Sequence, residues 1–324
     1  MANNALKIAL IVSMSLFMGV HSAFAQKTAE PTVPAPTLMQ GSTLPTTLTA
    51  TGWKGLLAVE VKINGAKQSE FFVMSTGMRE GAIHPQIAQK YRIEQLGTVL
   101  SLFVMGRKQD APVLPVKSFA LNGVKVADIS LGALDMAGQL SNRSASIQQA
   151  PVGWLGNSFL SLFQVTLDYA NQQIYLEDPK APFPKSPEAI QIPFTFKDGR
   201  IWVKVNIAGA KPFQAVLDTG TVGTLIPMEV GKQLSTLGQK TISVKTKTQR
   251  GAVIQTPIPS LRVGEVELHK VTGVFVSPDN PADMDTTFAT LGVNFLRYFR
   301  TTINYAKQKI VLIPVTVEQQ EATP

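Results

Sequence analysis

The residues best suited to chemistry form the tripeptide Asp218-Thr219-Gly220, which directly follows an apolar segment at 213–217. A carboxylate at the end of a buried strand is costly to desolvate, so it is rarely placed there for packing alone. Gly220 lets the chain reverse tightly, and the Thr219 hydroxyl can hold the turn. The same three residues also occur at ordinary strand-to-turn junctions, so their context has to decide their role.

A second version of this pattern lies earlier, where Ser75-Thr76-Gly77 follows a predicted strand at 70–74, an offset of 143 residues. Leu155-Gly156 and Leu291-Gly292 correspond at an offset of 136. Four further residues match at the same offset, namely Phe163, Tyr169, Ala170 and Ile174 with Phe299, Tyr305, Ala306 and Ile310. Matches in the same order with so little drift indicate an internal duplication.

An apolar strand running into Asp-Thr-Gly, followed about 72 residues later by Leu291-Gly292 and an aromatic-rich segment, resembles the retropepsin-like aspartic proteases. The resemblance covers most of residues 200–313. It implies that Asp218 is the catalytic carboxylate, that Thr219 and Gly220 support its turn, and that Leu291-Gly292 forms the strand behind it. By the same resemblance, Leu155-Gly156 is the supporting strand of the earlier version.

Alternating apolar residues closed by Asn-Gly turns favour strands throughout. The expected fold class is all-β, with two tandem retropepsin-like (acid protease) closed barrels after a signal peptide and a linker. The expected divisions are a signal peptide at 1–25, a Pro- and Thr-rich linker at 26–50, a degenerate copy at 51–178, a linker at 179–190, a copy with Asp-Thr-Gly at 191–316 and a tail at 317–324. We refer to 51–178 as copy one and to 191–316 as copy two. Short helices are expected at 85–91, 157–162, 227–234 and 294–298.

The N-terminus has the pattern of a secretory signal. Lys7 precedes an apolar run at 8–20, which is short for a membrane span, and Ala23-Phe24-Ala25 is a small-x-small cleavage site. The chain has no cysteine, which excludes a lipoprotein anchor. We expect a bacterial periplasmic protein, with secretion as the second choice. Residues 26–50 are either a tether or a propeptide.

The composition limits which kinds of partner the chain can bind. With 44% apolar and 16% charged residues the chain can form a core. Its net charge is +8, but its basic segments lack the interleaved aromatic residues of nucleic-acid binders. The three histidines are far apart, and Asp279, Asp283 and Asp285 lack the glycine and the final glutamate of a calcium loop. We therefore expect no cofactor, no metal, no nucleic acid and no integral membrane segment after signal removal. The expected partner is a peptide or protein substrate.

The chemistry has one difficulty. Aspartic proteases use two adjacent carboxylates that share one proton, and copy one supplies Ser75 at the place of the second acid. If the copies pair within the chain, losing one acid or base costs on the order of 10²- to 10⁴-fold in rate. The alternatives are a homodimer in which Asp218 faces its symmetry mate, a pseudoprotease that binds without cutting, or a substitute acid such as Glu80.

A hairpin covering the substrate is expected between each tripeptide and its Leu-Gly strand. In copy two the expected flap tip is Gln249, Arg250 and Gly251, and in copy one it lies at 105–108, although both are equally well explained as surface hairpins. The expected function is an exported aspartic-type endopeptidase that hydrolyses peptide bonds with a water activated by Asp218, and one option is that Asp218 is paired across a homodimer. The alternative is a non-catalytic pseudoprotease that binds peptides or envelope proteins in the inter-lobe cleft.

Overall fold

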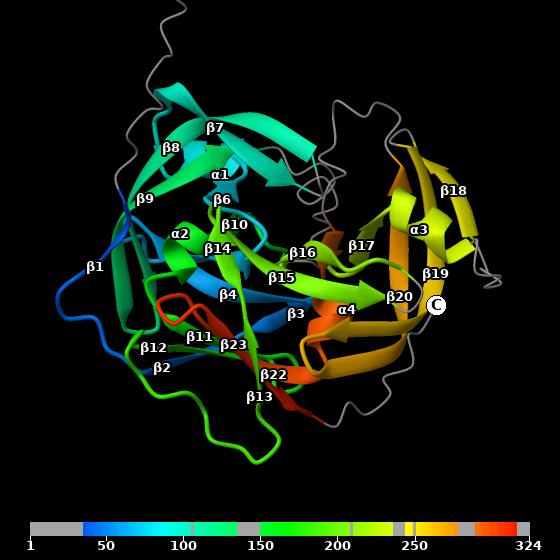
Figure 1. The fold of residues 1–324 in the computed structure, drawn as a ribbon. Helices are drawn as coiled ribbons and strands as arrows, with labels where there is room; N and C mark the ends of the chain where they lie inside the picture. The colour runs from blue at the N-terminus through cyan, green and yellow to red at the C-terminus, as the bar shows by residue number, and fades with distance from the viewer. Residues whose placement is uncertain are drawn as a thin grey trace, which may run out of the picture. The chain divides into compact units, whose positions relative to one another are not determined.

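The described chain contains two closed rings of β-strands (Figure 1). This computed structural model describes residues 35–104, 107–134, 150–207, 210–235, 244–248, 251–277 and 289–315. All of them belong to one compact unit, Val33–Pro324. The expected signal peptide, the expected tail and the tip residues Gln249 and Arg250 lie outside the described residues.

The first ring is built from copy one and closes because one long strand pairs with neighbours on both sides. In ring order its strands are β4 (Leu56–Ile63), β5 (Ser69–Met74), β10 (Gly153–Leu155), β6 (Gly81–Ile83), β9 (Val124–Ala133) and β8 (Arg107–Leu121), which returns to β4. Three further strands attach to it: β3 (Thr51–Trp53) to β4, β1 (Thr37–Leu38) to β9 and β7 (Leu96–Val104) to β8.

Copy two repeats this ring strand for strand. Its order is β15 (Arg200–Ile207), β16 (Phe213–Leu217), β21 (Ala289–Leu291), β17 (Thr224–Pro227), β20 (Val266–Ser277) and β19 (Gly251–Val263), closed by the β15–β19 pairing. The strand β14 (Thr195–Lys197) pairs with β15, and β18 (Val244–Thr248) pairs with β19. The two parallel pairings of the first ring, β5–β10 and β6–β9, recur as β16–β21 and β17–β20. The predicted all-β fold of two barrels is confirmed.

Within the described residues, four short helices accompany the rings: α1 (Pro85–Lys90), α2 (Asn157–Leu160), α3 (Met228–Ser235) and α4 (Val293–Leu296). They agree with the predicted helices to within two residues. In α1, Pro85 occupies the first turn, where its missing N–H costs nothing, and His84 Nδ1 accepts from the Gln86 N–H at 3.2 Å. No helix in the described part of the chain is long and apolar enough to cross a membrane.

A third sheet contains strands from both copies and lies across the bottom of Figure 1. Its order is β13 (Ile190–Pro193), β23 (Lys309–Pro314), β22 (Phe299–Asn304), β11 (Gln164–Asp168), β12 (Gln173–Glu177) and β2 (Thr46–Thr49). The copies meet where β11 pairs with β22, and the Thr166 and Thr302 hydroxyls lie 2.8 Å apart in the interior. This shared sheet joins the two rings into one body.

The prediction that residues 26–50 form a linker is wrong for the second part of that range. Strand β2 completes the shared sheet, and β1 pairs with β9. The cause is visible at Leu48, which is buried in the common core although its neighbours Thr47 and Thr49 are not. A single inward apolar residue in a threonine-rich strand was too weak a pattern to outweigh the surrounding prolines.

Candidate active site and peptide-binding site

The two tripeptides face each other within one chain. Ser75-Thr76-Gly77 (the Ser75 loop) follows β5, and Asp218-Thr219-Gly220 (the Asp218 loop) follows β16. The Ser75 hydroxyl donates a hydrogen bond to Asp218 Oδ1 at 2.9 Å. The group opposite the carboxylate is therefore a hydroxyl from copy one.

The two threonines lock these loops together in a symmetric way. The Thr76 hydroxyl donates to the Leu217 carbonyl at 2.6 Å, and the Thr219 hydroxyl donates to the Met74 carbonyl at 2.7 Å. Each threonine N–H also donates to the hydroxyl of the other, both at 3.2 Å. Both side chains are buried, so these bonds form away from water and fix the distance between the loops.

The half-buried Asp218 carboxylate accepts four hydrogen bonds. Besides Ser75, the N–H groups of Gly77 (3.1 Å) and Gly220 (2.7 Å) donate to Oδ1, and the Thr221 hydroxyl donates to Oδ2 at 2.6 Å. An ionised carboxylate is an acceptor only, so all four donors suit its charged form. Its orientation is fixed by groups from both copies.

The approach of the two loops requires glycine at both positions. A Cβ atom on Gly77 would lie 2.3–2.7 Å from the Asp218 carboxyl group, and one on Gly220 would lie 2.5 Å from Ser75 Oγ. No side chain fits at such distances. The glycines that the sequence indicated as turn residues are needed above all for close contact between the loops.

Thr221 belongs to the site but was not among the predicted site residues. The sequence feature that could have indicated it is a hydroxyl side chain three residues after the acid. At the matching place copy one has Met78, which is buried against Ala82, Leu102 and Ala111. Copy one therefore lacks the acid and also the hydroxyl that would hold an acid in place.

The Leu-Gly segments lie directly behind the loops, as the resemblance implied. The Ser75 N–H donates to the Leu155 carbonyl at 2.9 Å, and the Asp218 N–H donates to the Leu291 carbonyl at 3.0 Å. A Cβ on Gly156 would lie 2.6 Å from the Glu80 backbone, and one on Gly292 would lie 2.2 Å from the Gly223 carbonyl oxygen. Each glycine thus lets the outgoing loop pass over the end of the strand.

Asn157, which was not predicted as a site residue, supports the Ser75 loop from below. Its buried amide donates to the Thr76 and Gly199 carbonyls, both at 2.7 Å, and its Oδ1 accepts from the Tyr305 hydroxyl at 2.7 Å. Gly199 and Tyr305 belong to copy two, so a single side chain ties the Ser75 loop to the other ring. Burial raises the Tyr305 pKa above its ordinary range, which keeps this hydroxyl protonated as a donor.

Copy two has no equivalent of this amide. Val293 stands at the matching position and packs with Leu56, Ala58 and Val73. Tyr169, the counterpart of Tyr305, packs against the same cluster, and its buried hydroxyl has no hydrogen-bond partner in the described chain. Burial, and secondarily the Asp218 charge, raise the Tyr169 pKa above its ordinary range. The correspondence of Tyr169 with Tyr305 was visible in the sequence, but the difference between Asn157 and Val293 was not used to predict the site.

Glu80 does not take the place of the missing acid. Its carboxylate lies 3.3 Å from Arg79 Nε, and among the described residues it makes no contact with Asp218. Burial raises the pKa of Glu80, and the charge of Arg79 offsets part of that rise. The side chain is 15% exposed. Glu80 is therefore a poorly solvated acid near the Ser75 loop.

Both expected covering hairpins are present as strand pairs. Strands β7 and β8 form one, and β18 and β19 form the other, with Thr248 opposite Gly251. Gly251 begins β19, while the other two predicted tip residues of copy two, Gln249 and Arg250, are outside the described residues. A role in covering a ligand stays a prediction.

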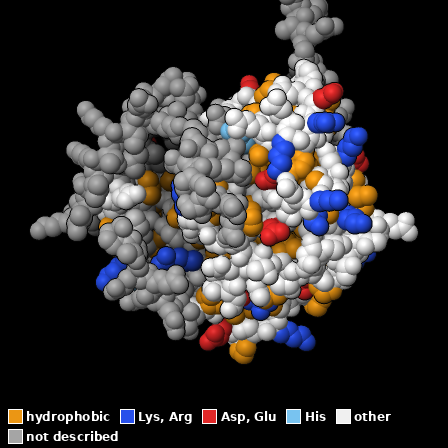
Figure 2. Space-filling view, turned by 180° about the vertical axis from the view of Figure 1, so that it is seen from behind, with side chains coloured by type: hydrophobic (Ala, Val, Ile, Leu, Met, Phe, Trp, Pro, Cys, Tyr) orange, Lys and Arg blue, Asp and Glu red, His pale blue; other side chains and the backbone are white. Residues whose placement is uncertain are grey.

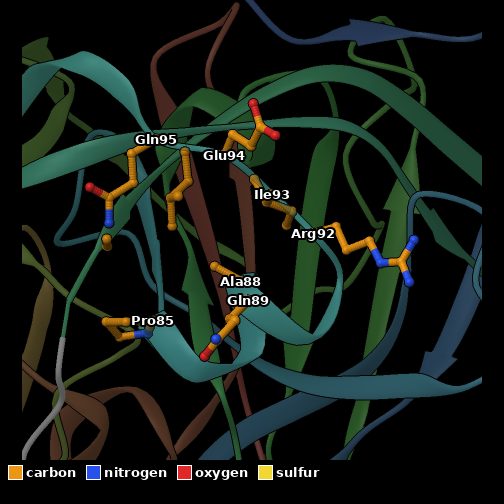
Figure 3. A pocket seen from close by; sticks show the side chains of 9 residues that line it. Pro85, Ala88, Gln89, Arg92, Ile93, Glu94 and Gln95 are labelled. Carbon is orange, nitrogen blue, oxygen red and sulfur yellow. The ribbon is translucent and has the colours of Figure 1, made fainter.

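A separate pocket of about 380 Å³ lies in copy one, beside α1 (Figure 3). It shares no lining residue with either loop. Its lining is made of Pro85, Ala88, Gln89, Arg92, Ile93, Glu94, Gln95, Leu114 and Ala133. The described residues contain no cluster of acidic and histidine side chains able to hold a metal ion. The facing loops thus remain the candidate site.

Residues 203–298 match the family model described as "gag-polyprotein putative aspartyl protease". The matched range includes the Asp218 loop and Leu291-Gly292. This match lies within copy two, and that part of the chain is therefore similar to the retropepsin-like aspartyl proteases. This retropepsin-like chain also resembles the crystal structure of an aspartic proteinase from Irpex lacteus, with a TM-score of 0.53 and 10% sequence identity over 86% of this chain and 100% of that one. That likeness concerns the two-lobed fold. No curated protein sequence matches the chain.

Proposed function

We propose that this retropepsin-like chain binds peptides between its two copies and has lost efficient hydrolysis. Its family and fold suggest peptidase activity. The observation that carries the proposal is the hydrogen bond from the Ser75 hydroxyl to Asp218 Oδ1. It places a group that cannot share an acidic proton where the second carboxylate of the catalytic pair would stand.

The mechanism needs two roles that one carboxylate cannot fill at once. The ionised acid takes a proton from water, while the protonated acid polarises the peptide carbonyl and later supplies a proton. A serine hydroxyl is neutral and too weakly acidic for the second role. Asp218 alone retains the first role, so a loss on the order of 10²- to 10⁴-fold in rate is expected.

The contacts between the copies support internal pairing over a dimer formed through copy two. Pairing two Asp218 loops would require the Ser75 loop to leave, which breaks the threonine bonds to Leu217 and Met74. It would also separate β11 from β22 in the shared sheet. Buried backbone groups that lose their partners are costly, so the internal pair is the favoured arrangement.

A second candidate is a slow peptidase in which Asp218 acts alone as general base. The Gly77, Gly220 and Thr221 donors favour it, because they hydrogen-bond to the carboxylate and orient it without Ser75. This candidate predicts measurable hydrolysis by the wild-type protein that disappears in Asp218→Asn.

The decisive variant is Ser75→Asp, which restores the acid. We expect hydrolysis of a quenched fluorescent peptide library between pH 3 and 7 to rise by about 10²-fold or more over wild type. Ser75→Asn is the matched control, because it has nearly the same size without an acid, and Asp218→Asn in the Ser75→Asp background should abolish the gain. Peptide binding by the wild-type protein is measured in parallel by anisotropy.

Three outcomes separate the candidates. Wild-type binding without hydrolysis, and hydrolysis by Ser75→Asp, supports the proposal. Measurable wild-type hydrolysis that disappears in Asp218→Asn supports the second candidate. A wild-type protein that neither binds nor cleaves any library peptide overturns both.

We also propose that the protein is exported to the bacterial periplasm, where its ligands would be peptides or envelope proteins. Lys7, the apolar run at 8–20 and Ala23-Phe24-Ala25 support this. Cell fractionation tests it, with Ala23→Leu and Ala25→Leu blocking the cleavage. A protein that stays in the cytoplasm at full length contradicts it.

A further inference from the structure

The pocket beside α1 lies where copy two carries an aromatic ring, and the strand pairing shows the equivalence. In copy one Ala133 of β9 lies opposite Ile83 of β6. In copy two Phe275 of β20 lies opposite Ile226 of β17 in the same parallel pairing. Ala133 and Phe275 therefore occupy equivalent positions, so copy one has a methyl group where copy two has a phenyl ring.

In copy two this ring packs against the neighbouring helix. Phe275 is 2% exposed, and a Cβ atom on Gly231 of α3 would lie 2.7 Å from its Cδ1 atom. At the offset of 143 residues that relates the two paired isoleucines, the counterpart of Gly231 is Ala88 of α1. Because Ala88 and Ala133 both line the pocket, the pocket occupies the place that the phenyl ring fills in copy two.

The pocket is large enough for a ring and for the atoms that carry it. Its volume of about 380 Å³ exceeds the roughly 150 Å³ of an apolar cavity that holds benzene, and it falls in the range of small-molecule sites. The buried part of its lining is apolar and comes from Ala88, Ile93 and Leu114. This interior suits an aromatic ring.

The rim of the pocket carries polar side chains. Gln89 and Gln95 are exposed, and neither carboxamide has a hydrogen-bond partner among the described residues. A carboxamide both donates and accepts, which suits the N–H and C=O groups of an amide. Figure 3 shows the Arg92 guanidinium turned away from the other labelled side chains, while the Glu94 carboxylate on the same rim disfavours an anion.

We propose that this pocket, which we call the ring pocket, is a second binding site that takes an aromatic ring joined to an uncharged amide. The ring lies between Ala88 and Ala133, and the amide lies at the rim beside Gln89 and Gln95. Both a small aromatic amide and an aromatic residue of a peptide have this chemistry. The ring pocket shares no lining residue with the facing loops, so the inference does not depend on the peptide binding proposed for them.

The test is an NMR titration of the full chain, labelled at its alanine and isoleucine methyl groups, with N-acetyl-phenylalanine amide. N-acetyl-alanine amide lacks the ring, and N-acetyl-phenylalanine has a carboxylate in place of the amide. An acetylated, amidated heptapeptide with one phenylalanine between six alanines presents the same ring within a chain. The methyl signals of Ala88, Ala133 and Ile93 locate the binding.

The blocking variant is Ala133→Phe, which gives copy one the ring of copy two. Ala133→Leu is a second blocking variant, which decides the test if the phenylalanine variant does not fold. Ala127→Phe is the matched control, because it makes the same change on β9 outside the pocket. Thermal unfolding verifies that each variant folds, and Ala133→Phe should melt no lower than wild type because it fills a gap.

We expect N-acetyl-phenylalanine amide to shift the Ala88 and Ile93 signals saturably in wild type and Ala127→Phe. Its affinity should exceed that of N-acetyl-alanine amide by about tenfold or more, since a ring is buried, and should fall by a similar factor in the Ala133 variants. Shifts at these methyls by the heptapeptide indicate an aromatic residue of a peptide, whereas shifts by the small amide alone indicate a free compound; either supports the inference.

Three results overturn the inference. The first is the absence of saturable shifts at these methyls with both ring-bearing amides. The second is an affinity that is unchanged in the Ala133 variants. The third is tighter binding of N-acetyl-phenylalanine than of its amide, which contradicts an uncharged ligand.

Discussion

The two copies have the same ring topology and the same type of loop, but they carry different functional groups of the site. Copy two retains the acid Asp218 and the hydroxyl of Thr221, with Val293 beneath them. Copy one has lost both groups and retains Asn157, which supports its loop and reaches into the other ring. The chemical group and its buried polar support are therefore divided between the copies. A pair of facing loops keeps its geometry with support on one side only.

Asn157→Val gives copy one the residue that copy two has at the matching position, and it should have the largest effect on stability. It leaves the Thr76 carbonyl, the Gly199 carbonyl and the Tyr305 hydroxyl without their partner. Each buried group left unpaired costs about 1–3 kcal/mol, so we expect the free energy of unfolding to fall by about 3–5 kcal/mol. Urea unfolding measures it.

The reciprocal change, Val293→Asn, is the control for that experiment. It offers an amide to the Tyr169 side of the site, where no amide stands now. A loss below about 1 kcal/mol in Asn157→Val would mean that copy one needs no polar support, and the contrast between the copies would then be one of sequence only.

The two matching tyrosines allow a second comparison, in which the expected changes in unfolding free energy are smaller and differ in sign. Tyr305→Phe removes the donor to Asn157 Oδ1 and should cost about 1–2 kcal/mol of unfolding free energy. Tyr169→Phe removes a buried hydroxyl without a partner and should be neutral or stabilising by up to about 1 kcal/mol. Thermal and urea unfolding of both variants measures the difference. Equal losses would show that Tyr169 is satisfied in solution, and the asymmetry would not hold.

Local sequence patterns predicted the strands and the short helices, and repeated spacing indicated the duplication. The closed barrels and the Leu-Gly strands behind the loops were implied by the resemblance to retropepsin-like proteases. Contacts between distant segments were not predictable in this way. The Asn157 bonds to Thr76 and Tyr305 join residues 81 and 148 apart in the chain, and the pairing of β2 with β12 joins an expected linker to the shared sheet.

The sequence also did not predict which loop would face Asp218. A homodimer and an internal pair place the same residues in the same local conformation, and they differ only in the partner. The threonine bonds across the two loops and the β11–β22 pairing bring the Ser75 loop opposite Asp218 in this chain. Similarly, the charge of Glu80 was visible early, while its weak compensation by an exposed Arg79 depends on burial.

The smallest expected effect concerns Glu80 of copy one, where copy two has Gly223. Burial raises the pKa of Glu80 above its ordinary value of 4.5, so the folded protein holds this proton more tightly than the unfolded chain does. The resulting contribution to stability is fully present below pH 4.5 and is lost as the pH rises from there through the folded-state pKa. Over that window wild type should lose stability relative to Glu80→Gln. Urea unfolding from pH 4 to 7 measures the two curves, and parallel curves would mean that water reaches this carboxylate freely in the folded state.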